Sequence, residues 1–124
     1  LLEKIEKRKI WVVTSVPLYW YRENKRGFNQ SSVIGKLFAE KLGLKYIETL
    51  KRVRYTTSQV KLEGNQRREN IKNAFEIDSN CNLSPETCVL LIDDVWTTGS
   101  TLKECCLILK KAGANKVWAL TLAR

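Results

Sequence analysis

The chain has 124 residues, of which 44% are hydrophobic and 28% are charged, and its formal net charge is +9 at pH 7. This length suits one domain with its own core, and no apolar run approaches the ~20 residues that a membrane span requires. The basic excess favours anionic partners, which leaves both a polyanionic small molecule and a nucleic acid open. Because the chain contains no Met, we expect it to be a fragment with a segment missing upstream.

Four cysteines and no histidine limit the chemistry of the chain. Cys81, Cys88, Cys105 and Cys106 lack CxxC spacing, so a zinc site is poorly supported. We expect these residues to be small buried hydrophobes in a reducing cytoplasm, since no signal-peptide pattern opens the chain. Any general acid–base catalysis would then depend on carboxylates, tyrosines, the substrate or water.

The first third of the chain predicts one strand and one long helix. Leu1 to Lys9 has the pattern of a helix end, and Ile10 to Val16 is β-branched and aromatic, which is typical of a buried strand. Gln30 to Leu42 predicts a helix that ends at Gly43. We expect the apolar residues of this helix to pack on the sheet: Val33, Ile34, Leu37, Phe38 and Leu42.

Between that strand and helix lies a cationic segment with interleaved aromatic residues, Leu18 to Gln30. Arg22, Lys25 and Arg26 suit phosphate groups, because the planar fork of Arg engages two phosphate oxygens. A solvated basic turn is the alternative. Cations beside aromatic rings also suit stacking on bases, so a nucleic-acid ligand remains open.

The middle of the chain predicts two short strands around a basic loop. Leu44 to Leu50 reads as a strand, and Lys51 to Lys72 is the most basic part of the chain, for which we expect a mobile loop. Glu63 to Asn73 predicts a short helix within it, and Ala74 to Ile77 a short strand. Asp78 to Glu86 is a connection rich in turn residues.

The most informative stretch is Val89 to Thr101, with the sequence VLLIDDVWTTGST. Its first four residues are apolar and predict a buried parallel strand, which Asp93 and Asp94 follow directly. A hydroxyl- and Gly-rich loop comes next, made of Thr97, Thr98, Gly99, Ser100 and Thr101. Leu102 to Lys111 then predicts a helix closed by Gly113, and Lys116 to Ala123 a final strand.

This loop suits a phosphate, because the first N–H groups of a helix lack partners within the helix and its dipole attracts anions. No Lys follows Gly99, so the loop is not a P-loop. Two acids at a strand end beside a phosphate loop suit a ligand with both hydroxyls and a phosphate, such as ribose 5-phosphate. The alternative is an ordinary helix start preceded by two solvated acids. In that case two carboxylates would lie at the end of a core strand, where burying a charge costs free energy, without binding a ligand.

Val89 to Thr101 resembles the 5-phosphoribosyl-1-pyrophosphate (PRPP) signature of type I phosphoribosyltransferases. The resemblance implies an α/β domain over residues 1–124 with a mainly parallel sheet flanked by helices. It also implies that Asp93 and Asp94 hold the ribose hydroxyls and that Thr97 to Thr101 hold the 5-phosphate. Pyrophosphate would bind in the loop after the first strand, at Arg22, Lys25 and Arg26, with Mg²⁺ held mainly through PRPP and indirectly by the two acids.

The sequence RGFNQ, from Arg26 to Gln30, resembles the ComF family of competence proteins more closely. In that family, residues 51–73 would form a flexible hood over PRPP, with matching positions at Arg54, Thr57, Gln59, Arg67 and Arg68. The hydroxyl residue usual in the hood is absent, since Glu63 takes its place. The zinc ribbon that usually precedes this domain is not in the sequence.

The resemblance implies a magnesium-dependent phosphoribosyltransferase whose acceptor is unidentified, linked to DNA uptake. Two alternatives stay open: a non-catalytic competence factor that binds single-stranded DNA, with a helicase as partner, and a PRPP sensor. An oligomer is possible. Thr97 stands where purine-salvage members have an Asp, so we expect purine bases to be poor acceptors.

Overall fold

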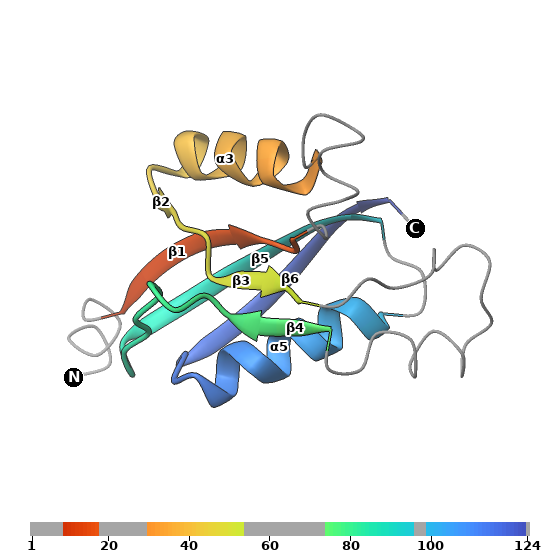
Figure 1. Cartoon of the computed structure of the whole chain (residues 1–124). Helices are drawn as coiled ribbons and strands as arrows, with labels where there is room; N and C mark the ends of the chain where they lie inside the picture. The colour runs from red at the N-terminus through yellow and green to blue at the C-terminus, as the bar shows by residue number, and fades with distance from the viewer. Residues whose placement is uncertain (1–8, 18–29, 54–73, 96–98, 124) are drawn as a thin grey trace.

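A computed structural model describes residues 9–17, 30–53, 74–95 and 99–123. Its main sheet has the strand order β2-β1-β5-β6, and every neighbouring pair is parallel. Helices cover both faces of this sheet (Figure 1). The α/β class with a mainly parallel sheet, expected from the sequence, is therefore confirmed. The bounds are β1 Ile10–Ser15, β2 Lys45–Tyr46, β5 Thr87–Val95, β6 Lys116–Ala123, α3 Gln30–Leu42 and α5 Ser100–Lys111.

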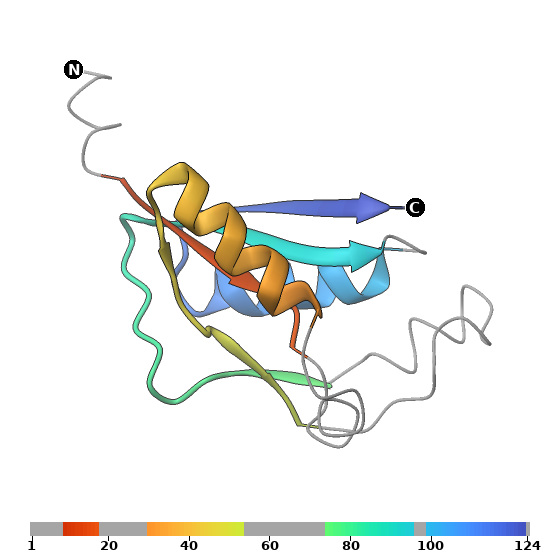
Figure 2. The same ribbon diagram turned by 90° about the horizontal axis from the view of Figure 1, so that it is seen from above.

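The two central strands, β1 and β5, pair from Ile10 opposite Thr87 to Ser15 opposite Ile92. Their middle residues are apolar or small and almost fully buried, as expected for parallel strands covered on both faces. The strands all point the same way, so their carboxyl ends meet at one edge of the sheet (Figure 2). This edge is where ligands collect in open α/β sheets.

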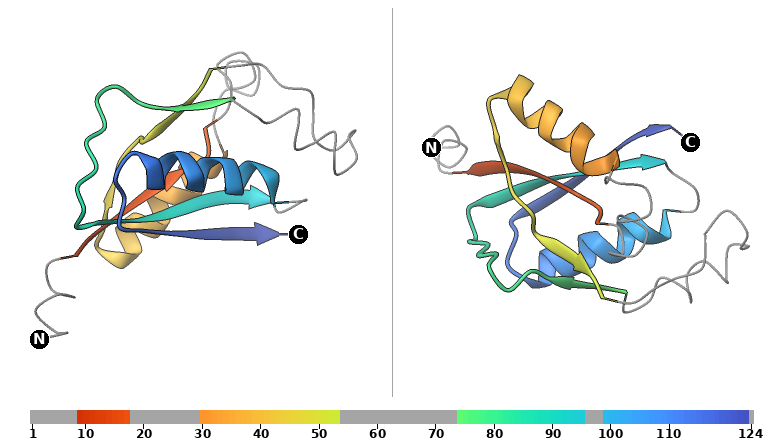
Figure 3. Two further views of the ribbon diagram at one scale, coloured as in Figure 1. Left: turned by 90° about the horizontal axis from the view of Figure 1, so that it is seen from below. Right: turned by 45° about the horizontal axis from the view of Figure 1, so that its top comes forward.

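Helix α5 packs through large apolar side chains. Leu102, Cys105 and Leu109 are at most 3% exposed and form a cluster with Val89 and Leu91 of β5. A separate antiparallel pair, β3 (Leu50–Arg52) and β4 (Phe75–Ile77), lies on the same side of the sheet as α5 and adds Leu50 and Phe75 to the cluster (Figure 3). The largest core of the described residues therefore lies on this side.

Helix α3 packs differently, and the predicted apolar face is wrong for three residues. Val33, Leu37 and Leu42 are 47%, 52% and 55% exposed, whereas Ile34 and Phe38 do pack against the core. The fully buried residues of this helix are the small residues Ser31, Gly35 and Ala39. Small residues let the helix backbone approach closely: a Cβ added at Gly35 would lie 2.9 Å from Cε2 of Tyr46.

The predicted strand Leu44 to Leu50 is also wrong, because the chain leaves the main sheet within it. Only Lys45 and Tyr46 pair with β1, and Leu50 begins β3 in the second sheet. Thr49, in between, is buried and its Oγ1 lies 2.8 Å from Oγ1 of Thr14, so a buried polar contact marks the bend. Lys51 and Arg52, placed in the predicted hood loop, belong to β3 instead.

Other predictions are confirmed or adjusted by a few residues. The bounds of α3 and β6 are as predicted, and Gly43 and Gly113 follow the two helices with φ of 68° and 114°. β5 is longer than predicted, because Asp93 still pairs with Thr121 and Val95 with Ala123. The two acids therefore lie within the strand, near its carboxyl end, rather than after it.

Three further observations concern the described ranges only. Neither helix there has the length and apolar character that a membrane span requires. Cys88 and Cys105 are buried as expected, while Cys81 and Cys106 are half-buried. The edge strand β6 exposes Trp118 by 60%, and the Trp118 ring meets Trp11 edge to face at 5.0 Å between centroids. α3 lies over β1 and leaves this strand uncovered (Figure 2).

Candidate functional site

Two neighbouring carboxylates mark the carboxyl end of β5. Asp93 and Asp94 are half-buried there, beside the end of β6, where Thr121 pairs with Asp93. The first turn of α3 reaches the same place, because Oγ of Ser31 donates a hydrogen bond to Oδ1 of Asp93 at 3.2 Å. Three elements that are distant in sequence therefore converge on Asp93.

The environment of Asp93 disfavours its charged form. Burial is the main cause and the negative charge of Asp94 the next, and together they raise the pKa of Asp93 to about 7. Hydrogen bonds from the Asp94 N–H, at 2.9 Å to Oδ1, and from Ser31 act in the opposite direction. A ligand that donates hydroxyl groups, or that develops positive charge here, would relieve this cost.

Helix α5 begins just after the acids. Its N-cap is Gly99, with φ 81° and ψ 2°, a left-handed conformation that favours glycine. Glycine has no side chain with which to cap the helix, and the helix dipole gives the N-terminus a partial positive charge. Ser100 is buried and Thr101 half-buried at this end. Backbone and hydroxyl donors close to two carboxylates can bind a molecule that carries both an anion and hydroxyls.

The described residues include only part of the predicted site. Asp93, Asp94, Gly99, Ser100 and Thr101 follow one another along the end of β5 and the start of α5. The other predicted site residues lie outside the described ranges: Arg22, Lys25, Arg26, Arg54, Gln59, Arg67, Arg68, Thr97 and Thr98.

Sequence reasoning missed Ser31, because a serine in the first turn of a helix is an ordinary helix-start residue. The available signal was its position: Ser31, Gly35 and Ala39 recur at one helical spacing and form a stripe of small residues. Such a stripe indicates a close approach of the helix to another element, and therefore that Ser31 faces inward.

Arg52 is a second residue that the sequence did not single out. Its guanidinium lies 5.1 Å from the centroid of the Phe75 ring, on the α5 side of the sheet. Burial raises the pKa of Cys105 well above its usual range; the charge of Asp93 adds to this, and the charge of Arg52 opposes it. The positive charge of Arg52 and the negative charge of Asp93 thus act on the same buried thiol.

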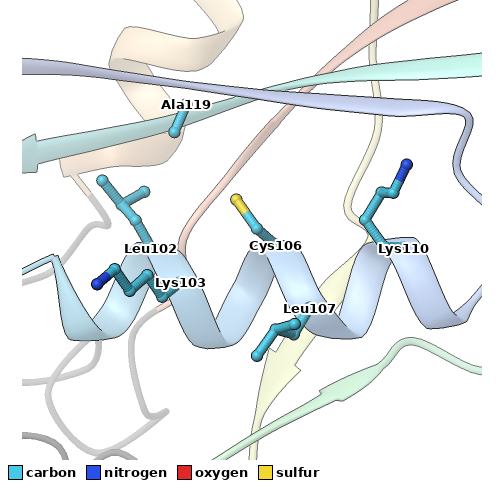
Figure 4. Close-up of a pocket in the computed structure, with 6 residues that line it drawn as sticks. All are labelled: Leu102, Lys103, Cys106, Leu107, Lys110 and Ala119. Atoms are coloured by element: carbon cyan, nitrogen blue, oxygen red, sulfur yellow. The ribbon is translucent and has the colours of Figure 1, made fainter.

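A groove of about 410 Å³ lies elsewhere, between α5 and β6. Leu102, Cys106 and Ala119 form part of its apolar lining, with Lys103 and Lys110 also contributing (Figure 4). None of the predicted ligand-binding residues lines it. An apolar lining does not suit a sugar phosphate, so the groove is not the candidate site.

Within the described ranges, no three His, Cys, Asp or Glu residues gather in a group that could hold a metal ion. The pair Asp93 and Asp94 offers carboxylate oxygens, the ligand type that Mg²⁺ prefers. Two carboxylates without further protein ligands fit a magnesium ion that keeps water and ligand phosphates in its shell.

Comparison with solved structures defines the class of fold. The chain superposes over 97% of its length on a hypoxanthine phosphoribosyltransferase from Staphylococcus aureus, covering 56% of that chain, with TM-score 0.55 and 14% identity. It superposes equally far on the allosteric regulatory enzyme of purine biosynthesis, covering 25% of that chain, with TM-score 0.58 and 19% identity. The fold is therefore that of the type I phosphoribosyltransferases.

Sequence comparison is more specific, although no protein-family model matches the chain. Competence protein F of Haemophilus influenzae is 38% identical over 113 residues, which are 90% of this chain and 49% of that protein. Competence protein ComFC of Streptococcus pneumoniae is 31% identical over 124 residues, all of this chain and 53% of that protein. The chain belongs to the ComF family, and it spans about half the length of these relatives.

Proposed function

We propose that this chain binds PRPP together with Mg²⁺ at the carboxyl end of β5 and transfers its phosphoribosyl group to an acceptor in the cytoplasm. The observation that supports this most is the pair Asp93 and Asp94 near the end of a core strand, five to six residues before the helix N-cap Gly99. A ribose 5-phosphate requires carboxylates that accept hydrogen bonds from its hydroxyls and a helix N-terminus that binds its phosphate.

Different groups of residues bind different parts of PRPP. Asp93 and Asp94 accept hydrogen bonds from the ribose hydroxyls, and the segment Thr97 to Thr101 donates to the 5-phosphate. Arg22, Lys25 and Arg26 bind the pyrophosphate, and residues 54–73 supply the hood with Arg54, Gln59, Arg67 and Arg68. Mg²⁺, which Asp93 and Asp94 would help to hold indirectly through the ligand, would offset negative charge on the leaving group.

The charges that develop during the reaction explain why acids would bind the ribose and cations the pyrophosphate. When the bond between C1 and the pyrophosphate oxygen breaks, the ribose ring gains positive charge and the leaving pyrophosphate takes the electron pair. Asp93 and Asp94 stabilise the ring, while Arg22, Lys25 and Arg26 stabilise the leaving group. Closure of the hood excludes water and limits hydrolysis.

The acceptor is constrained by one residue. Thr97 cannot remove a proton from a purine base as a carboxylate would, so an amine or another nucleophile is the better acceptor. Turnover with hypoxanthine, measured beside turnover with ammonia, tests this. Efficient hypoxanthine use would contradict the assignment.

Titration calorimetry of the full-length protein with PRPP and Mg²⁺ tests the proposal. We expect saturable binding that weakens when Mg²⁺ is removed by a chelator, because the metal neutralises the pyrophosphate. Ribose 5-phosphate should bind more weakly, since it lacks the pyrophosphate. Absence of PRPP binding with Mg²⁺ present would overturn the proposal, whereas binding without turnover would indicate a PRPP sensor.

A second candidate is a competence factor that binds single-stranded DNA and works with a helicase. It is favoured by the net charge of +9 and by relatives that are named competence and DNA utilization proteins. Binding to oligo-dT should then weaken steeply as the salt concentration rises, because phosphate contacts release counterions. Oligo-dT that fails to bind at low salt would exclude this function.

A further inference from the structure

Ser31 joins helix α3 to the candidate site. It lies in the first turn of the helix, is 5% exposed, and donates from Oγ to Oδ1 of Asp93 at 3.2 Å. A serine in the first turn of a helix usually bonds to backbone N–H groups of its own helix. Here the hydroxyl crosses to a strand that is far away in sequence.

The packing of α3 makes this contact possible. Gly35 and Ala39, one and two turns further on, are buried against the sheet and have no bulky side chains that would hold the helix away. Replacing Gly35 by a larger residue would bring its Cβ to 2.9 Å from the Tyr46 ring, so the helix has little room to move. The short side chain of Ser31 can therefore reach Asp93.

The contact also fixes the carboxylate of Asp93. Ser31 Oγ and the Asp94 N–H both donate to the same oxygen, Oδ1, at 3.2 Å and 2.9 Å. Two donors on one oxygen set the rotation of the carboxylate plane and direct the second oxygen, Oδ2, away from them. A preorganised acceptor loses less entropy when a ligand binds.

We propose that Ser31 is a positioning residue: it holds Asp93 in the rotamer in which Oδ2 accepts a hydrogen bond from a ribose hydroxyl of PRPP. The inference rests on the proposed function, since it concerns how the ribose end of that ligand is held. Ser31 itself need not touch the ligand. Its role predicts an effect on the ribose contacts and none on the pyrophosphate contacts.

The neighbouring Ser32 provides a matched control. It lies on the same helix turn and accepts a hydrogen bond from the Tyr46 hydroxyl at 3.2 Å, in contact with β2 rather than with the acids. Ser32→Ala removes an equal number of atoms from the same turn. A general weakening of α3 should therefore follow from both substitutions, but loss of Asp93 positioning only from Ser31→Ala.

Titration calorimetry of the full-length protein measures affinity for PRPP and for pyrophosphate, each with Mg²⁺. We expect Ser31→Ala to weaken PRPP binding about five- to tenfold, the scale for the net contribution of one hydrogen bond, and to leave pyrophosphate binding unchanged. Ser32→Ala should bind both ligands like the wild type. If Ser31→Ala fails to fold, Ser31→Cys keeps the size with a weaker donor and should show the same loss.

Three outcomes would overturn the inference. Ser31→Ala could bind PRPP as tightly as the wild type, both serine variants could weaken it equally, or PRPP and pyrophosphate affinity could fall together. In each case the wild type still binds PRPP, so the proposed function stands and only the role of Ser31 is lost. A wild type that does not bind PRPP removes both.

Discussion

The two helices that flank the sheet are fastened in different ways. α5 buries Leu102, Cys105 and Leu109, whereas α3 turns Ser31, Gly35 and Ala39 inward and leaves Val33 and Leu37 about half exposed. The first arrangement contributes apolar burial, and the second gives a short distance between helix and sheet. The comparison indicates that α5 contributes the larger share of the apolar core, while the close packing of α3 also brings a polar group to Asp93 of β5.

The largest expected effect concerns stability. Leu109 is fully buried in α5, so Leu109→Ala should lower the free energy of unfolding by about 2–5 kcal/mol. The same change at the 52% exposed Leu37 of α3 should cost less than about 1 kcal/mol. Urea unfolding measures both. Equal losses would mean that the two helices do not differ as described.

Asp94→Asn should lower PRPP affinity or turnover about 100-fold, the scale for loss of one preorganised electrostatic contact. The change is nearly isosteric and removes one of two neighbouring charges, so the fold should survive. Calorimetry and thermal unfolding of the same sample separate the two effects. If PRPP binding is untouched, the assignment of the acids to the ribose is wrong.

Gly35→Val tests the close approach of α3. Its Cβ would lie 2.9 Å from the Tyr46 ring, whose hydroxyl is held by hydrogen bonds to Ser15 and Ser32, so we expect a loss of about 1–3 kcal/mol. The matched control is Glu40→Val, which puts the same β-branched residue at an exposed position of the same helix. Loss of the same size in both variants would contradict a tight helix–sheet contact.

The stability of the fold should also depend on pH, through Asp93. The folded-state pKa of Asp93 is raised to about 7 from a usual value of 3.8, so the folded state binds more protons than the unfolded state between these values. Stability from this group is therefore fully present below about pH 4 and lost as the pH rises to about 7. The melting temperature should therefore fall steadily as the pH rises over this range.

Asp93→Asn should remove that part of the slope, because the amide does not titrate. Glu76→Gln, at an exposed position of β4, is the control and should leave the slope as it is. An unchanged slope in Asp93→Asn would mean that the burial of Asp93 carries no such cost.

Elements governed by local patterns could be predicted from the sequence. The spacing of apolar residues predicts the bounds of α3 and β6. The glycines after both helices are predicted by the left-handed backbone conformation that often ends a helix, and both signals are local. The strand expected at Leu44 to Leu50 is divided between two sheets, and the buried contact between Thr14 and Thr49 at this division joins residues far apart in sequence. No local pattern contains it.

The candidate site also contains some residues that a local sequence pattern identifies and one that depends on tertiary packing. Asp93, Asp94 and the segment at Gly99 could be found because they lie in one continuous stretch. Ser31 could not, since its contact with Asp93 depends on how closely α3 packs. Hydrophobic residues were expected to face the sheet, and the small residues that do so carry little hydropathy signal.

A crystal structure of the full-length protein with PRPP and Mg²⁺ would test the central claim most directly. The account predicts ribose hydroxyls within about 3 Å of the carboxylates of Asp93 and Asp94, with the 5-phosphate at the start of α5. PRPP bound elsewhere, or with its ribose turned away from both acids, would contradict it.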